Sequence, residues 1–390
     1  MSLLANDERY DDDLTAIKQN GRYRQRVFTQ IQNKFIHIDE HALINFSGND
    51  YLGLSQHVEV KKQVQQAIEH YGVGSTSSAI VSGSHYLIEA LEHDIAAFVG
   101  YPRALLFNSG YHANLAVMSL LAGKAKKEKN VQTVVADKLV HASILDGIAL
   151  SGAKLKRYPH QNTDSLRTIL KKHPEAKYVI TEGVFSMDGD ISPLERLANV
   201  GLAKLIVDDA HGFGVLGQSG RGAVSHAGFT FEDVPVMIVP CGKALGAMGA
   251  LVCASEEFIE LLIQTARSYI YSTALAIPVV AALNASLKLV MEGDCLRDKL
   301  FENIAFFNQY AQKLGLHVVS YDLTPIRSII IGDNQQTQNI QSMLKDKGFY
   351  VSCIRPPTVP EHSARLRISL TALHDTGDIT ALLDQLVCVL

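Results

Sequence analysis

The stretch "VMIVPCGKALGAMGALVCAS", residues 236–255, holds two short apolar runs on either side of a single lysine, Lys243. Neither run alternates apolar with polar residues, which is typical of strands that are buried on both faces. Five similar runs lie upstream, between stretches with helical periodicity: "ALLF", "QTVVAD", "LKRYP", "YVITEGVF" and "KLIVDDA". Apolar strands that alternate with helices predict an α/β fold with a mostly parallel, seven-stranded sheet.

The chain of 390 residues is long enough for one large and one smaller domain. We expect an N-terminal arm over residues 1–44, with a helix around residues 7–20, a basic turn and a short hairpin. A large domain is expected over residues 45–280. The pattern after it, with short apolar runs and two further helices, predicts a smaller α+β domain over residues 281–390.

Composition narrows the class of protein. Charged residues make up 19% and hydrophobic residues 47%, and the net charge of -4 gives no electrostatic reason to expect nucleic acid as a partner. No run reaches the roughly 18–20 apolar residues of a membrane-spanning helix. The N-terminus lacks the apolar core of a signal peptide, and the five cysteines are scattered without a C-x-x-C pair. We therefore expect a cytoplasmic protein with no membrane partner and no metal.

Lys243 is the first candidate for chemistry, because ligands of parallel sheets bind at the carboxyl ends of the strands. Two interpretations are open. The lysine reaches out to solvent along small neighbours, or desolvation lowers the pKa of its amine and makes it a nucleophile toward an aldehyde.

Asp208 directly follows the buried-type strand "KLIVD" and has His211 three residues further on. A carboxylate at such a place is tolerated when it has a cationic or proton-sharing partner, and a pyridinium nitrogen is one such partner. His211 then contacts a second polar atom of the same ring. The alternative is an aspartate that caps a helix, next to a histidine on the surface.

Three other strand-end loops are less specific. Ser109, Gly110 and Tyr111 stand between a strand and a helix, where unsatisfied amides bind anions, although a plain turn also fits. His141 either lies on a ligand ring or caps a helix. Ser186 either reaches a phenolic oxygen or satisfies its own turn.

The order of these groups resembles the pyridoxal 5'-phosphate (PLP) enzymes of the aspartate aminotransferase fold, fold type I. Within them, the motifs resemble the α-oxoamine synthase family and run from residue 45 to residue 374. The matching segments are "NFSGNDYLGLS" (45–55), "GVGSTSSAIVSG" (72–83), "VHASILDG" (140–147), "TEGVFSMDGD" (181–190), "VDDAHGFGVLG" (207–217), "GKALG" (242–246) and "YSTALAIP" (271–278).

The resemblance implies decarboxylative condensation of an amino acid with an acyl thioester. The segment "IRPPTVPEHSARLRISLTALH" (354–374) resembles the members that join L-alanine to a pimeloyl thioester, on coenzyme A or acyl carrier protein, in biotin biosynthesis. One alternative is a glycine-using member of the 2-amino-3-ketobutyrate ligase or 5-aminolevulinate synthase type. Another is a catalytically silent scaffold subunit, but such subunits lack the lysine.

The resemblance also implies roles for single residues. Lys243 bonds to the cofactor and moves the substrate proton, Asp208 keeps the pyridine nitrogen protonated, and His141 stacks on the ring. Further PLP contacts are implied for Ser109, Gly110, Tyr111, Ser186 and His211, and for Ser272 and Thr273 of the neighbouring subunit in a homodimer with a shared active site. Substrate contacts are implied for Arg22, Arg24, Asn49, Thr358 and Arg367.

Some of these assignments have alternatives. Arg367 is expected to hold the alanine carboxylate through its planar fork, and the alternative is a strand arginine that points to solvent. Arg22 and Arg24 are both candidates for contact with the acyl substrate, and the alternative is a solvated basic turn.

Two positions depart from the family pattern. Pro240 stands three residues before the lysine, where family members commonly carry a hydroxyl residue, and proline offers neither a hydroxyl nor an N–H to a phosphate. Ile88 replaces a histidine, with His85 one turn earlier. The phosphate contact expected at residue 240 must therefore come from other groups.

Overall fold

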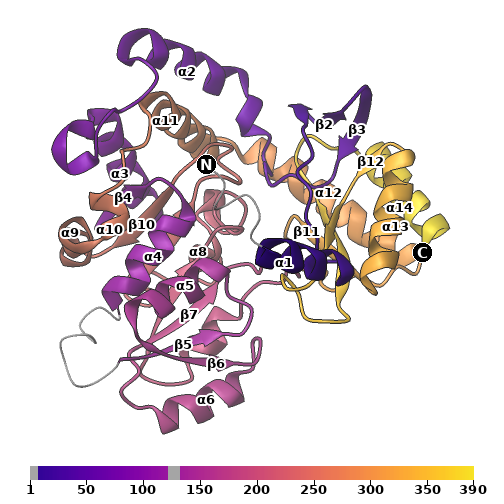
Figure 1. Cartoon of the computed structure of the whole chain (residues 1–390). Coiled ribbons are helices and arrows are strands. Elements are labelled where there is room, and N and C mark those ends of the chain that lie inside the picture. The colour runs from indigo at the N-terminus through magenta and orange to yellow at the C-terminus, as the bar shows by residue number, and fades with distance from the viewer. Residues whose placement is uncertain (1–7, 122–131) are drawn as a thin grey trace. The chain divides into compact units, whose positions relative to one another are not determined.

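The structure is a computed structural model that describes residues 8–121 and 132–390 (Figure 1). The first seven residues of the expected arm lie outside the described residues. The chain forms two compact units: a first unit of residues 49–302 and 322–324, and a second unit of residues 1–48, 303–321 and 325–390. The domain boundaries expected from the sequence stay a prediction, although the one at residue 280 falls inside helix α11 (Ile277–Glu292).

The first unit is built on the predicted seven-stranded sheet. From β9 to β6 all neighbouring strands pair in parallel, whereas β10 runs antiparallel to both of its neighbours. The expectation of a mostly parallel sheet is therefore confirmed. The order across the sheet is β4 (Arg103–Phe107), β10 (Ala250–Ala254), β9 (Val236–Pro240), β8 (Lys204–Asp208), β7 (Tyr178–Glu182), β5 (Thr133–Asp137) and β6 (Lys154–Tyr158).

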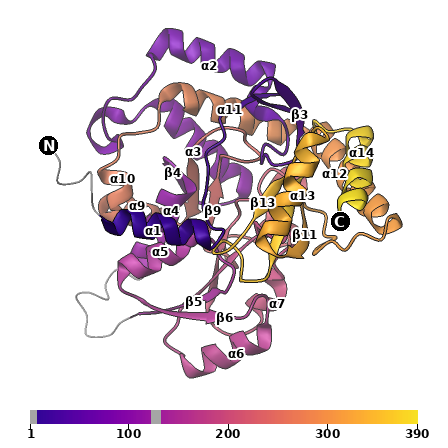
Figure 2. The ribbon, with the colours of Figure 1, turned by 45° about the vertical axis from the view of Figure 1, so that its right-hand side comes forward.

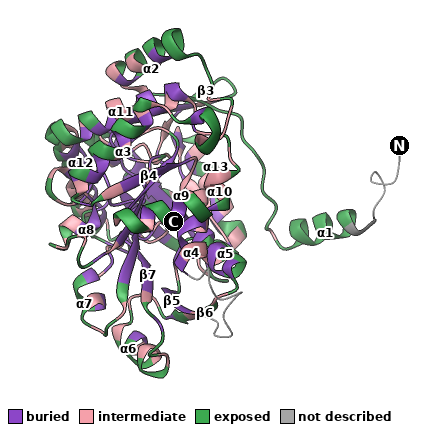
Figure 3. Cartoon of the chain, turned by 90° about the vertical axis from the view of Figure 1, so that its left-hand side faces the viewer, coloured by how far each residue is buried: buried purple, intermediate pink, exposed green. Residues whose placement is uncertain are grey.

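The central strands are buried along their length, and Figure 3 shows them in the interior of the first unit. Every residue of β5 and β10 is buried, as the continuous apolar runs predict. Strand β6 lies at the sheet edge, beside helix α6 (Thr163–Lys172) in Figures 1 and 2. Its sequence "KLKRY" leaves Lys154 and Arg157 exposed, and such charges protect an open edge from pairing with another chain.

Helices cover the sheet. Side chains of α4, α5 and α9 join those of the strands in one buried cluster. Gly147 lets α4 and α5 approach closely, because a Cβ there would lie 2.8 Å from Cβ of Met118. The remaining helices of the first unit include α2 and α3, which end before Gly72 and Gly100 as predicted. The helix bounds are α2 (Val58–Tyr71), α3 (Tyr86–Val99), α4 (Gly110–Leu121), α5 (Ala142–Ser151), α7 (Leu194–Ala198), α8 (Ala223–His226), α9 (Glu256–Thr265) and α10 (Arg267–Ile270), and α12 (Asp294–Lys313) continues into the second unit.

The second unit has the predicted α+β character. Its hairpin pairs Ile38 with His41, as the sequence "FIHIDEHALINF" indicates. The apolar run at residues 316–320 forms no strand, although Val319 donates its N–H to Ser328 O at 2.9 Å. The elements are α1 (Glu8–Gln19), a sheet of β1 (Gln30–Gln32), β2 (Phe35–Ile38), β3 (His41–Asn45) and β12 (Phe349–Tyr350), a sheet of β11 (Ile326–Gly332), β14 (Ala364–Ser369) and β13 (Ser352–Ile354), and helices α13 (Asn334–Asp346) and α14 (Thr376–Val389).

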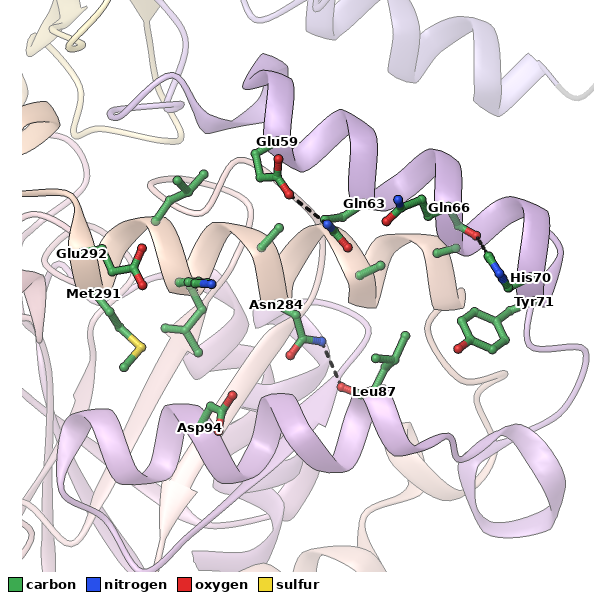
Figure 4. A pocket seen from close by; sticks show the side chains of 16 residues that line it. Glu59, Gln63, Gln66, His70, Tyr71, Leu87, Asp94, Asn284, Met291 and Glu292 are labelled. Atoms are coloured by element: carbon green, nitrogen blue, oxygen red, sulfur yellow. Dashed lines mark hydrogen bonds between the residues drawn. The ribbon is translucent and has the colours of Figure 1, made fainter.

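A groove of about 980 Å³ lies on the first unit between α2, α3 and α11. Figure 4 shows hydrogen bonds between some of the residues that line it. Gln63 donates to Glu59 at 2.8 Å, and Asn284 donates to Leu87 O at 3.0 Å. The strand-end loops do not contribute to the lining of this groove. Within the described part of the chain, no helix has the length and apolar character needed to cross a membrane.

Candidate active site

A cavity of about 310 Å³ opens at the carboxyl ends of β4, β5, β7, β8 and β9, all within the first unit. Parallel strands bring their following loops to the same edge of the sheet, which is why groups far apart in sequence meet here. The predicted residues that line this cavity are Asn49, Ser109, Gly110, Tyr111, His141, Ser186, Asp208, His211 and Lys243.

Asp208 is held firmly at the end of β8. It is only 4% exposed, and its Oδ2 accepts a hydrogen bond from Nδ2 of Asn114 at 2.8 Å, while Oδ1 accepts one from the Ala210 amide at 3.1 Å. Asn114 in turn contacts Ser143 Oγ at 3.0 Å. Sequence reasoning missed Asn114 and Ser143, whose polar side chains on two helices gave no motif. Together they fix a buried carboxylate that faces a cavity.

His211 is buried, so the alternative of a surface histidine is wrong. Its Nδ1 lies 2.6 Å from the hydroxyl of Tyr51. That hydroxyl also donates to Oδ1 of Asn49, at 3.2 Å. The "NDY" motif and the "DDAH" motif therefore meet at the cavity wall, in a chain of hydrogen bonds that orients the imidazole.

Lys243 lies in a tight loop between β9 and β10. The loop closes on itself because Cys241 N donates to Gly249 O at 2.9 Å and Ala247 N donates to Cys241 O at 3.2 Å. Gly246 has a φ of 62°, and a Cβ there would lie 2.3 Å from Ser55 N, so only glycine fits this turn. Lys243 is half-buried and lines the cavity. The lowered pKa expected for its amine stays a prediction.

The start of α4 forms another wall. The first amides of an α-helix have no partner inside the helix and favour an anion. Gly110 begins this helix, and a Cβ on it would lie 2.9 Å from Cγ of Pro240. The helix start and the end of β9 are thus packed so closely that the position requires glycine. Ser109 Oγ accepts a hydrogen bond from the His112 amide at 3.2 Å.

Of the two interpretations of His141, the structure shows that it caps a helix, and its position also allows it to lie on a ligand ring. It caps α5, since Nδ1 accepts a hydrogen bond from the Ser143 amide at 3.3 Å, and it also lines the cavity. Burial lowers the pKa of His141 from its ordinary value; the Asp208 carboxylate opposes this shift and the Lys243 ammonium adds to it. A largely neutral imidazole therefore faces the cavity.

Glu182 is a cavity residue that sequence reasoning missed. It ends β7 beside Asp208, its partner in the parallel ladder, and it is only 2% exposed. Burial, reinforced by the Asp208 carboxylate and opposed by Lys243, raises the pKa of Glu182 to about 8. The signal was present in the sequence, because a charged residue ends the apolar run "YVITE" in the same way that Asp208 ends "KLIVD".

Other predicted residues lie elsewhere. In this chain Ser272 and Thr273 do not line the cavity, and Thr273 O accepts a hydrogen bond from Asn108 at 2.8 Å. Of the two departures from the family pattern, Ile88 is buried in the core, and His85, one turn earlier, caps α3. Pro240 lines the cavity, where it packs on Gly110.

Four substrate candidates belong to the second unit. Arg367 in β14 is 4% exposed and donates to Ser369 Oγ at 2.9 Å, so the alternative of an arginine that points to solvent is wrong. Arg22 pairs with Glu361. The Thr358 amide donates to Arg355 O at 3.1 Å, and Arg24 is exposed.

A charged cluster holds the loop that carries Ser186. His160 lies 3.0 Å from Asp137 through Nδ1 and 2.8 Å from Asp190 through Nε2. Burial lowers the pKa of His160, but the two aspartates outweigh it and raise the pKa to about 10. His160, Asp188 and Asp190 are close enough together to hold a metal ion. An imidazolium with both nitrogens engaged is an ion-pair partner, however, and we assign no metal here.

Comparison with known proteins shows the family to which the chain belongs. Residues 41–386 match the family described as aminotransferase class I and II. The chain is 45% identical over 373 residues to an 8-amino-7-oxononanoate synthase from Marinobacter nauticus, covering 95% of this chain and 93% of that protein.

Solved structures give the same result. An 8-amino-7-oxononanoate synthase from Francisella tularensis matches with a TM-score of 0.79 at 39% identity, covering 89% of this chain and 97% of that chain. A serine palmitoyltransferase from S. paucimobilis that holds PLP as an aldimine with myriocin matches with a TM-score of 0.90 at 26% identity, covering 100% and 98%. The fold and the resemblance predicted from the motifs are confirmed, and the chain belongs to the aminotransferase class I and II family.

Proposed function

We propose that this chain catalyses the decarboxylative condensation of L-alanine with a pimeloyl thioester, giving 8-amino-7-oxononanoate, carbon dioxide and the free thiol, in biotin biosynthesis. The observation that carries the proposal is the convergence of Lys243, Asp208 and His141 on one cavity with the start of helix α4. The proposal is supported by full-length similarity to proteins named for this product, at 43–45% identity.

The residues of the cavity fit PLP. The cofactor has a phosphate, a pyridine nitrogen and an aldehyde, and the cavity offers a group of suitable chemistry for each. The amides at Gly110 and Tyr111 begin a helix and suit the phosphate. Asp208 is a buried carboxylate anchored by Asn114, which suits a protonated ring nitrogen. Lys243 supplies the amine for the aldehyde.

Because Pro240 has no group to offer the phosphate, the start of α4 binds it instead, with Ser109 beside it. Ser186 and His211 are proposed partners of the ring's phenolic oxygen. His141 caps α5, and its largely neutral imidazole is proposed to lie on the face of the ring. When bound, PLP supplies an electron sink that stabilises negative charge at the amino acid's Cα.

The chain's own groups carry the proton transfers. The Lys243 amine takes the proton from Cα of L-alanine and returns a proton to the product carbon. Asp208 is proposed to contact the protonated ring nitrogen from its buried place at the end of β8. Arg367 is proposed to hold the alanine carboxylate, and Asn49, Thr358 and Arg22 or Arg24 are proposed to contact the acyl substrate. We also propose that the chain has the three parts expected from its sequence, residues 1–44, 45–280 and 281–390.

We further propose a cytoplasmic homodimer in which Ser272 and Thr273 reach the neighbour's phosphate. Support comes from large apolar side chains exposed on the first unit around these residues and around "GVGSTSSAIVSG". Tyr271 is 71% exposed, Val81 79% and Tyr86 71%. Exposed apolar groups gathered in this way mark a protein interface. Coenzyme A and acyl carrier protein are both compatible as carriers of the pimeloyl group.

The test is a titration of the purified PLP-loaded protein with L-alanine and then with glycine, followed through the cofactor's absorbance. We expect L-alanine to perturb the band and pimeloyl-coenzyme A to restore it with release of thiol. A response to glycine alone would favour the 2-amino-3-ketobutyrate ligase or 5-aminolevulinate synthase type. No cofactor band in the wild type would favour a silent subunit, although the presence of Lys243 argues against that alternative.

A further inference from the structure

Glu182 is a buried carboxyl that the proposed function leaves without a role. It ends β7 at the floor of the cavity, next to the end of β8 where Asp208 lies, and Gly183 N donates to Asp208 O at 2.8 Å. In a parallel pair, partners in the ladder direct their side chains to the same face of the sheet. The carboxyl groups of Glu182 and Asp208 therefore lie side by side, and only that of Asp208 is assigned to the cofactor.

The contacts of Glu182 link two loops of the site. Its carboxyl lies close enough to the main-chain amides of His141, after β5, and Ser186, after β7, for both amides to favour its charged form. These residues carry the two side chains that are proposed to contact the ring face and its phenolic oxygen. A single carboxyl thus fixes the relative positions of both loops. A shift of about 1 Å in such groups can cost on the order of 100-fold in rate.

The second carboxyl oxygen adds an independent observation. Oε1 of Glu182 is buried and has no hydrogen-bond partner among the residues that the structure describes. A buried polar atom without a partner destabilises the folded state, so its presence calls for a physical reason. Oε1 belongs to a residue that lines the cavity, and the proposed function gives it no partner.

We propose that Glu182 is a positioning residue of the cofactor site, whose uncharged carboxyl holds His141 and Ser186 in place for the ring. This inference rests on the proposed function. An uncharged form is consistent with the surroundings, since Asp208 lies beside it and burial raises the pKa of Glu182 to about 8. Lys243, whose positive charge opposes the raised pKa of Glu182, is then left to the aldehyde rather than paired with Glu182.

Two substitutions test separately the hydrogen-bond acceptor of Glu182 and its negative charge. Glu182→Gln keeps a carbonyl oxygen for both amides and places an amide N–H₂ where the neutral acid has its second oxygen. Glu182→Met keeps the length of the side chain and removes the acceptor. Matched controls are Glu92→Gln and Glu92→Met, because Glu92 also accepts a main-chain amide, from Leu106 at 2.8 Å, and its pKa is raised to about 7, mainly by burial. Glu92 does not line the cavity.

The measurements are the dissociation constant of PLP from the full-length protein, the circular dichroism of the cofactor band, kcat/KM for L-alanine, and the melting temperature. For Glu182→Met we expect PLP to bind roughly 10- to 100-fold more weakly, as is typical when a residue that orients a cofactor ligand is removed, with an altered dichroism band. Glu182→Gln should restore binding to within about threefold of the wild type. The Glu92 variants should lower the melting temperature and leave the band unchanged.

Three outcomes would overturn the inference. Glu182→Met could match Glu92→Met in affinity and band shape, which would make the role purely structural. Glu182→Gln could be as impaired as Glu182→Met, which would make the charge essential. If Glu182→Met does not fold, Glu182→Gln decides alone, and a loss of PLP affinity of tenfold or more would count against the inference. A wild type that binds no PLP would instead overturn the proposed function, and this inference with it.

Discussion

The ion-pair cluster at His160 allows a quantitative prediction. His160 joins Asp137, at the end of β5, to Asp190, in the loop after β7, and its ring packs edge-on against Phe185 at 4.3 Å between centroids. The substitution His160→Gln removes the positive charge and keeps a polar side chain. Asp137 is fully buried. The substitution therefore removes the ion-pair partner of a carboxylate that water does not reach.

The pH dependence follows from the raised pKa. A histidine has a pKa of about 6.5 in the unfolded chain, and the pKa of His160 is raised to about 10. The folded state therefore binds this proton more tightly, so the stabilisation is complete below about pH 6.5 and is lost as the pH rises toward 10. One pKa unit corresponds to about 1.4 kcal/mol, so the contribution is at most roughly 5 kcal/mol at pH 6. It declines by about 1.4 kcal/mol per pH unit above pH 7.

Urea unfolding of the wild type and His160→Gln, at fixed concentrations of protein and PLP, measures this difference at pH 6, 8 and 10. We expect a loss of about 3–5 kcal/mol at pH 6, as when one partner of a buried pair is removed, and a much smaller loss at pH 10. His93→Gln is the control, because His93 pairs with Asp94 at 3.2 Å on the surface with 79% of its side chain exposed. A loss for His160→Gln that does not change between pH 6 and pH 10 would refute the reasoning.

Three further predictions concern the cavity. Lys243→Ala should bind PLP without the absorbance band of the lysine-linked cofactor and should lose at least about 10³-fold in kcat, measured by thiol release. Asp208→Asn should lower kcat/KM on the order of 10²- to 10³-fold while the melting temperature changes little, and unchanged kcat/KM would contradict its role. Gly110→Ala should weaken PLP binding about tenfold through overlap with Pro240, and the added substitution Pro240→Ala should recover part of that loss by removing the atom at 2.9 Å.

The fold was largely predictable from local patterns. Continuous apolar runs separated by helices indicate a parallel sheet, and the structure has the seven expected strands. The apolar run at residues 316–320 forms no strand. A short apolar run forms a strand only with a partner along its length, and in the described structure this run belongs to none of the three sheets. Sequence patterns record the apolar run but not the partner.

The site was predictable where a residue stands at a strand end with a recognisable motif. Asp208, Lys243 and His141 are of this kind. Asn114 escaped notice because it lies within a helix, at a position that becomes relevant only when α4 packs beside the end of β8. Glu182 carried a signal, the charged end of the apolar run "YVITE", but its place beside Asp208 depends on which strands pair. Such supporting groups are defined by three-dimensional proximity, which periodicity does not encode.

The central claim is that L-alanine loses its carboxyl carbon as it is joined to a pimeloyl group at the Lys243 cavity. The most direct measurement is mass spectrometry of the products formed from L-alanine labelled with ¹³C at the carboxyl carbon and pimeloyl-coenzyme A. We expect labelled carbon dioxide and unlabelled 8-amino-7-oxononanoate in equal amounts from the wild type and neither from Lys243→Ala. A product that retains the label, or turnover with glycine and none with L-alanine, would contradict the account.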